Sequence, residues 1–175
     1  MKKRELERRL TELGFGIPDY LRFVPIDFEA GASWREGLIA AGFDERRPAI
    51  IASSGVSMYL TKETNAATLR EVATLAPGST FVMTFLLPVD LVAREVRAGM
   101  EMAEKGAAAS GTPFISFFAP DEILALAHEA GFATAAHVSG ADLAQRYFAG
   151  RGDGLRPPDH AEDLLVATNE EAGTG

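Results

Sequence analysis

Two groups of residues with useful chemistry follow apolar stretches that resemble parallel strands. Asp27 and Phe28 end the stretch from Leu21 to Phe28, and Ser54 and Gly55 follow the next one. Ligands of open α/β sheets bind at the carboxyl ends of the strands, so these residues mark the expected ligand edge. A carboxylate there accepts hydrogen bonds from an exocyclic amine or a ribose hydroxyl, and a phenyl ring can lie against a flat base. The spacing also leaves open that Asp27 caps the following turn or helix.

The segment after the second stretch adds a glycine and a tyrosine. Gly55 has no Cβ, so a ligand can approach its backbone closely. Tyr59 either faces a bound small molecule or anchors the loop on the core, and both interpretations are open. Neither Ser53 nor Ser54 lies in the G-x-S-x-G arrangement of a hydrolase, which argues against a nucleophilic serine.

The three histidines are predicted to lie apart, on a helix, a strand and a loop. We expect His128, His137 and His160 to be ordinary surface or packing residues. No pair has the spacing of metal ligands, and the chain has no cysteine, so no metal site or thiolate nucleophile is predicted.

Two glycine-rich strings resemble nucleotide-binding loops only in composition. The string at 14–16 follows a helix, and the string at 150–154 has no strand leading directly into it. A dinucleotide fingerprint requires a strand, then glycines, then a helix. Both strings are therefore predicted to be turns.

Hydrophobic periodicity predicts strands and helices that alternate along the chain. Strands are expected over residues 21–28, 49–52, 80–87, 133–138 and 164–168, and helices over residues 3–13, 34–42, 62–75, 89–112, 120–130 and 142–148. Such alternation favours a parallel α/β sheet, and the short connection between the last two strands permits an antiparallel ending. Pro25 argues for an edge position of the first strand, because proline cannot donate to the ladder.

Length and charge limit the domain count and the partners. The 175 residues suffice for one domain over residues 1–169, with a frayed tail at 170–175. The net charge of −8 disfavours nucleic acid as a partner, and no apolar stretch is long enough to span a membrane. The N-terminus lacks the apolar region of a secretion signal, so we expect a cytoplasmic protein.

Five strings in order resemble the leucine carboxyl methyltransferase-like family of class I S-adenosylmethionine-dependent O-methyltransferases. They are RFVPIDFE at 22–29, GVSMYLT at 55–61, APGS at 76–79, FFAPDE at 117–122 and RYFAGR at 146–151. The resemblance runs from about residue 6 to residue 168. It covers only the C-terminal portion of the family fold.

The resemblance implies a fold and a set of binding residues. The family's strand order is 3-2-1-4-5-7-6, and its first two strands, with the glycine-rich loop and the acid that binds the ribose hydroxyls, have no counterpart in this sequence. The expected fold is therefore a partial Rossmann-like methyltransferase sheet, mostly parallel with an antiparallel C-terminal strand. In the family pattern, Asp27 holds the adenine amine, Phe28 packs near the adenine, and Ser54 and Gly55 line the cofactor pocket. Ser54 replaces an acid that the family usually has at this position.

Two functions are compatible with this resemblance. The first is an S-adenosylmethionine-dependent O-methyltransferase fragment of weakened or absent activity, acting on a small-molecule hydroxyl or a carboxylate near Tyr59. The second is a non-catalytic, pseudoenzyme-like domain whose open strand edge, at residues 49–52, leads to a homodimer or to pairing with a separate N-terminal half. Both interpretations expect Asp27 and Ser54 on a common rim.

Overall fold

The computed structural model describes residues 3–28 and 33–169 of the chain. The chain divides into two compact units, Met1–Glu45 and Arg46–Gly175. The predicted frayed tail at 170–175 lies outside the described residues. Within the described ranges, no helix combines the length and the apolar character needed to cross a lipid bilayer.

The first unit begins with the predicted N-terminal helix. α1 (Lys3–Glu12) carries an exposed ion-pair network, in which Arg8 lies 2.8 Å from Glu5 and 2.6 Å from Glu12. These partners are three and four residues away and therefore share one helix face. The chain turns after the helix at Gly14, whose φ of +80° favours glycine.

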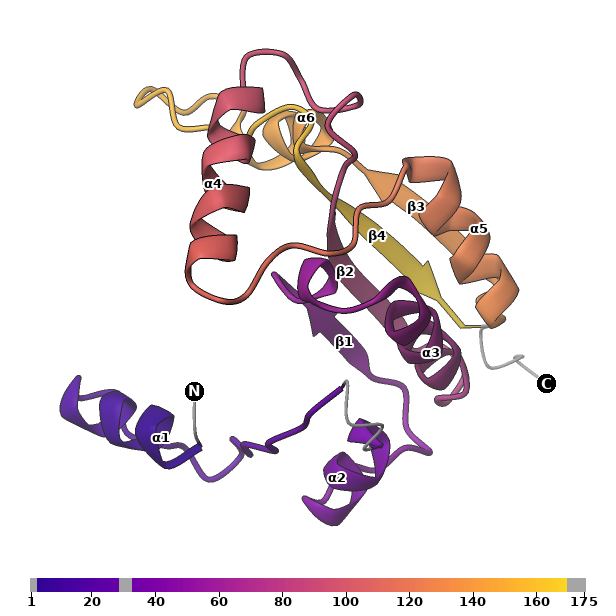
Figure 1. The fold of residues 1–175 in the computed structure, drawn as a ribbon. Coiled ribbons are helices and arrows are strands. Elements are labelled where there is room, and N and C mark those ends of the chain that lie inside the picture. Colours follow the sequence, from indigo (N-terminus) through magenta and orange to yellow (C-terminus); the bar gives the residue numbers. More distant parts are fainter. Residues whose placement is uncertain (1–2, 29–32, 170–175) are drawn as a thin grey trace. The chain divides into compact units, whose positions relative to one another are not determined.

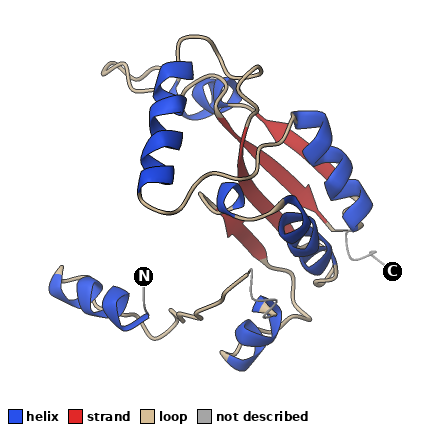
Figure 2. Ribbon diagram, in the orientation of Figure 1, coloured by secondary structure: helices blue, strands red, loops and turns tan. Residues whose placement is uncertain are grey.

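The prediction of a strand from Leu21 to Phe28 is wrong, because this segment is irregular (Figure 2). Its apolar residues contact α2 (Trp34–Ala40) instead. The side chains of Val24 and Ile26 lie 2.9 Å from where a Cβ on Gly37 would be, so the absence of that atom lets them approach the helix. A strand needs a neighbouring strand for its backbone groups, and none exists among the described residues of this unit.

The second unit is built on one four-stranded sheet. Its strands are β1 (Ile50–Ser53), β2 (Thr80–Leu86), β3 (Thr134–Val138) and β4 (Glu162–Thr168). The spatial order is β1-β2-β4-β3, with β1 parallel to β2 and with β4 antiparallel to both its neighbours (Figure 1). The predicted fold class is confirmed, and the order corresponds to 4-5-7-6 in the family's numbering.

Two helices cover the same face of this sheet. α3 (Lys62–Ala73) begins at the predicted N-cap Thr61, whose hydroxyl accepts a hydrogen bond from the backbone of Thr64. α5 (Pro120–Ala130) ends at Gly131, which has a φ of +106°. The two helices pack side by side, and α5 also contacts β3 and β4 (Figure 1).

The remaining helical segments differ in extent or type from what the sequence predicts. α4 (Arg97–Ala109) occupies only part of the range 89–112, because the residues before it form turns that the Arg97 side chain closes by donating to backbone carbonyls. The helix predicted over 142–148 is a short α6 (Gly140–Leu143) followed by a π-helical turn, Ala144–Phe148.

The sheet has one buried face and one that is only partly covered. The buried face is apolar, and its members come from both long strands and from the two covering helices: Phe81, Met83, Phe85, Leu165, Ala167, Leu69, Val72 and Ile123. On the other face, Val82, Thr84 and Val166 are only half-buried, and Ile50 on the outermost strand is 85% exposed. One flank of the sheet is therefore left without a full apolar cover.

We predict that Gly140→Ala destabilises the second unit. An added Cβ would overlap the carbonyl oxygen of Pro158 and lie 2.9 Å from its carbonyl carbon, and backbone atoms cannot move aside cheaply. Overpacking of this kind costs ~1–3 kcal/mol. Urea denaturation measures the change. Gly106→Ala in α4 is the control, because its Cβ would meet nothing within 4 Å, and it should gain about 0.5 kcal/mol.

Candidate functional site

The carboxyl end of β1 leads into an open turn. Gly55 has a φ of +66°, and a Cβ placed there would have no atom within 4 Å. Its backbone N–H donates to Oγ1 of Thr84 on the neighbouring strand at 2.8 Å, which fixes the turn to the end of β2. The backbone at Ser54 and Gly55 is therefore held in place while the space beside it is free for a ligand.

A buried hydrogen-bond network holds the next segment, the 3-10 turn Ser57–Tyr59. The Ser57 hydroxyl donates to the Thr84 carbonyl at 2.7 Å. Asn65, which is 2% exposed, donates to the carbonyls of Ser57 and Thr61, both at 3.0 Å. These bonds connect the turn to β2 and to α3, so the position of Tyr59 is set by buried polar contacts on both sides.

Tyr59 lines a hollow of about 360 Å³ with residues that precede α5. The other lining residues are Gly111, Thr112, Pro113 and Ile115. Ile115 donates its backbone N–H to the Met58 carbonyl at 2.8 Å, and the Phe114 ring meets the Tyr59 ring edge-on at 5.4 Å. Apolar walls with one phenolic hydroxyl suit a small organic molecule.

Asp27 and Phe28 belong to the first unit, whereas Ser54, Gly55 and Tyr59 belong to the second. Asp27 is exposed and Phe28 is half-buried. Because the Leu21–Phe28 segment is not a strand, Asp27 does not end one, and the expectation that two strand ends bring Asp27 and Ser54 together loses its structural basis. The placement of Asp27 and Ser54 on a common rim of the sheet remains a prediction.

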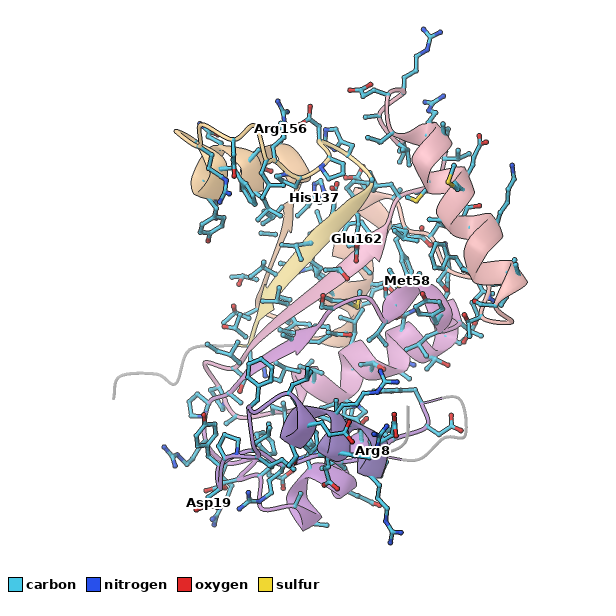
Figure 3. All side chains as sticks on the ribbon, turned by 90° about the vertical axis from the view of Figure 1, so that its left-hand side faces the viewer. Arg8, Asp19, Met58, His137, Arg156 and Glu162 are labelled. Atoms are coloured by element: carbon cyan, nitrogen blue, oxygen red, sulfur yellow. The ribbon has the colours of Figure 1, made fainter. Side chains whose placement is uncertain are left out.

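The sequence interpretation missed a cluster around Asp163. This carboxylate is fully buried, and its Oδ2 lies 2.8 Å from Nε2 of His137 and 3.5 Å from Nδ1 of His160. Gly140 donates its backbone N–H to Oδ1 at 3.3 Å. Figure 3 shows His137 beside the start of β4, near Glu162. The three histidines lie on a helix, a strand and a loop as predicted, but two of them share one acid.

A sequence signal for this cluster existed. β4 begins two residues earlier than predicted, so Asp163 belongs to the strand and is not a residue of the preceding loop. An acid inside an otherwise apolar strand requires a buried partner. His137 near the end of the preceding strand was the available candidate.

Each of the four predicted cofactor-binding residues has a group whose chemistry suits adenosine. Asp27 offers a carboxylate for an amine and Phe28 a ring for a base, whereas Ser54 offers a hydroxyl and Gly55 an accessible backbone. These groups are divided between the two units. Among the described residues, no group of three or more acids and histidines is arranged to hold a metal ion.

The sequence is similar to known methyltransferases. Residues 4–73 match the family described as Leucine carboxyl methyltransferase. Over 150 residues the chain is 31% identical to the putative S-adenosyl-L-methionine-dependent methyltransferase YktD of Bacillus subtilis, and the match covers 85% of this chain and 49% of that protein. The predicted family resemblance is confirmed, and the chain spans about half the length of this curated relative.

Solved structures share the fold. An O-methyltransferase family protein from Burkholderia thailandensis aligns with a TM-score of 0.57 at 11% identity, covering 97% of this chain and 42% of the other. The structure described as PigF with SAH aligns with a TM-score of 0.55 at 18% identity, covering 95% and 40%. At such low identities the likeness shows the fold alone, which is that of part of a methyltransferase.

We predict that Asn65→Ala loosens the turn that carries Tyr59. The substitution leaves the buried carbonyls of Ser57 and Thr61 without their donor, at a cost of ~1–3 kcal/mol. Hydrogen exchange should show faster exchange at Tyr59 and Leu60, together with lower stability to urea. Glu63→Gln on the exposed side of the same helix should change stability by less than about 0.5 kcal/mol. Unchanged exchange in Asn65→Ala would contradict this role.

Proposed function

We propose that this chain, a relative of the leucine carboxyl methyltransferase family, forms the acceptor-binding part of an S-adenosylmethionine-dependent O-methyltransferase. The observation that carries the proposal is the hollow beside Tyr59, which lies just beyond the carboxyl end of β1. Ligands of open α/β sheets bind at this edge. The proposed methyl acceptor is a small molecule with a hydroxyl or a carboxylate.

The proposed cofactor contacts follow the family pattern. Asp27 would hold the adenine amine and Phe28 would pack near the adenine, while Ser54 and Gly55 would line the pocket. When bound, S-adenosylmethionine supplies a methyl group attached to a positively charged sulfur. Such chemistry needs no metal, so the protein's part is to align the acceptor oxygen and to exclude water. Tyr59 and the apolar residues of the hollow would perform that alignment.

We predict that the chain by itself binds S-adenosylmethionine more weakly than micromolar or not at all, because half of the contacts expected from the family pattern are missing. Ser54, which stands where the family usually has an acid, is one position where a contact can be restored. Ser54→Glu should tighten binding by about tenfold, since a hydrogen bond to a charged group contributes about 1.5 kcal/mol. Calorimetric titration of the purified chain measures both. Ser54→Gln is the matched control of similar size without the charge, and it should bind no better than the unmodified chain.

Two results would count against the predicted role of position 54. Micromolar binding by the unmodified monomer would show that the acid at position 54 is dispensable. Equal affinities of the Ser54→Glu and Ser54→Gln chains would show that this position does not face the cofactor.

The second candidate function is a non-catalytic domain that pairs through the edge of its sheet. β1 is the outermost strand, and its parallel pairing with β2 uses only one of its two edges. Ala49 accepts a hydrogen bond from Thr80 at 2.9 Å, and backbone groups alternate along a strand, so those of Ile50 and Ala52 are directed away from β2. An edge of this kind is a template for another strand. The proposed occupant is a second copy or a separate N-terminal half.

Sedimentation of the full chain distinguishes the two functions. If the edge pairs, the unmodified chain should associate as its concentration rises, and Ile50→Lys should remain a monomer because a charged side chain blocks strand addition. The exposure of Ile50 makes the lysine compatible with the fold. Tyr147→Lys, which also places a charge at an exposed ring but follows β3 at the opposite edge of the same sheet, is the control. A well-behaved monomer at high concentration would rule out self-pairing.

A further inference from the structure

The buried carboxylate of Asp163 is the most constrained charged group described in the second unit. Its exposed fraction is 0%, and its polar partners within the described part of the chain are two imidazoles and one backbone N–H. Burying an ionised carboxylate is costly unless it is paired and hydrogen-bonded. The pair with His137 at 2.8 Å meets that need, and the side chain of His137 remains 22% exposed.

The hydrogen bonds define which nitrogen of the neutral His137 ring can accept a proton. Nε2 lies against the Asp163 carboxylate, which can only accept, so in the neutral imidazole Nε2 carries the proton. The lone pair is then on Nδ1. The ring of Phe85 lies 5.9 Å from the imidazole, tilted by 52°, and limits its rotation. Asp163 is itself held by the backbone of Gly140. The arrangement is that of a partly exposed base oriented by a buried acid.

The cluster lies at the same edge of the sheet as the hollow. β1, β2 and β3 run in one direction, since β2 and β3 are each antiparallel to β4, so His137 and Ser53 are both near carboxyl ends. Backbone bonds around the end of β2 connect the two places. Leu87 donates to Ala161, next to His160, and Phe118 of the segment that follows the hollow donates to Leu86.

We propose that His137, positioned by Asp163, accepts the proton of the methyl acceptor, and that the acceptor is therefore an alcohol or a phenol. This inference rests on the proposed function and narrows it. A carboxylic acid is already ionised at neutral pH and needs no base, whereas a hydroxyl group must lose its proton before or as it reacts. An imidazole oriented by a buried acid supplies the base that the second class requires.

The step balances in atoms and charge. The acceptor's O–H proton moves to Nδ1 of His137, and the oxygen forms a bond to the methyl carbon as the bond from that carbon to sulfur breaks, with its electron pair left on sulfur. The positive charge lost at sulfur is gained by the imidazolium, which Asp163 stabilises. Water then takes the proton from Nδ1.

Two further titratable groups lie near the pair of His137 and Asp163. His160 approaches the same oxygen of Asp163 at 3.5 Å, and its side chain is 46% exposed. Asp142 lies close enough for a Coulombic interaction with His137, although the Ser139 hydroxyl is the main cause of the lowered pKa of Asp142. Neither forms a hydrogen bond with His137 in the described structure, so Asp163 is the hydrogen-bond partner that orients the imidazole.

Binding of 4-nitrophenol to the full chain tests the assignment without requiring turnover. The titration is done about one pH unit below the point at which free 4-nitrophenol is half ionised, and phenolate absorbance is recorded. We expect the bound probe to be ionised by the unmodified chain and by His160→Gln, and to stay neutral on His137→Gln. Asp163→Asn should reduce the ionised fraction several-fold. In a competition experiment, benzoate should bind the chain no more tightly than 4-nitrophenol does.

Nitrogen NMR of the His137 ring, recorded without 4-nitrophenol, is a second test of the assignment. The Nε2–H tautomer is expected in the unmodified chain, and the preference should disappear in Asp163→Asn. The assignment would be overturned if the unmodified chain did not bind 4-nitrophenol or bound it in its neutral form. It would also be overturned if His137→Gln ionised the bound probe to the same extent, or if the unmodified chain showed the Nδ1–H tautomer of His137. The proposed function is judged separately by the S-adenosylmethionine titration of Ser54→Glu, so the two failures are distinguishable.

Discussion

The insertion of β4 between β2 and β3 is the interaction on which the rest of the second unit depends. β4 bonds to β2 along seven residue pairs, from Thr80 with Thr168 to Leu86 with Glu162, and to β3 along five. Because it is antiparallel to both, its first residues, Glu162 and Asp163, lie at the edge where β1, β2 and β3 end. Without that reversal, Asp163 would not meet His137, and the edge would consist only of loops from the middle of the chain.

The same sheet explains why two different functions are compatible with one structure. One side of the sheet, its carboxyl edge, carries the hollow beside Tyr59 and the buried pair of Asp163 and His137. On the β1 side it ends in a short strand with an exposed isoleucine, and one sheet face is only half covered. The first side is suited to binding a small molecule. The second is suited to contact with another polypeptide, and an assembly of this kind would combine both uses.

Most of the fold could be predicted from periodicity, and the exceptions have physical reasons. The strand at Thr80–Leu86 and the helix at Pro120–Ala130 agree with the sequence because burial, capping and turn residues all favour one structure there. The segment from Leu21 to Phe28 is as apolar as a strand, but Pro25 removes a backbone donor, and no described strand of its unit is available to pair with it. Its apolar side chains contact a helix, which the same composition permits.

The candidate site was predictable only where a residue's role follows from its local backbone. Gly55 and Tyr59 could be selected because they follow an apolar strand directly, and local order along the chain places them at its end. His137, His160 and Asp163 could not be brought together from the sequence. Their proximity depends on the register between β3 and β4, and a shift of one residue would turn Asp163 to the opposite face.

The sequence by itself determined the fold class, the family resemblance and the elements of the sheet, because hydrophobic period and capping residues are local properties. Only the tertiary structure decided that an acid lies buried between two histidines, that the first apolar segment packs as an irregular chain, and that one sheet face is left partly open. Each of these depends on which distant segment supplies the neighbouring atoms, and no local pattern contains that information.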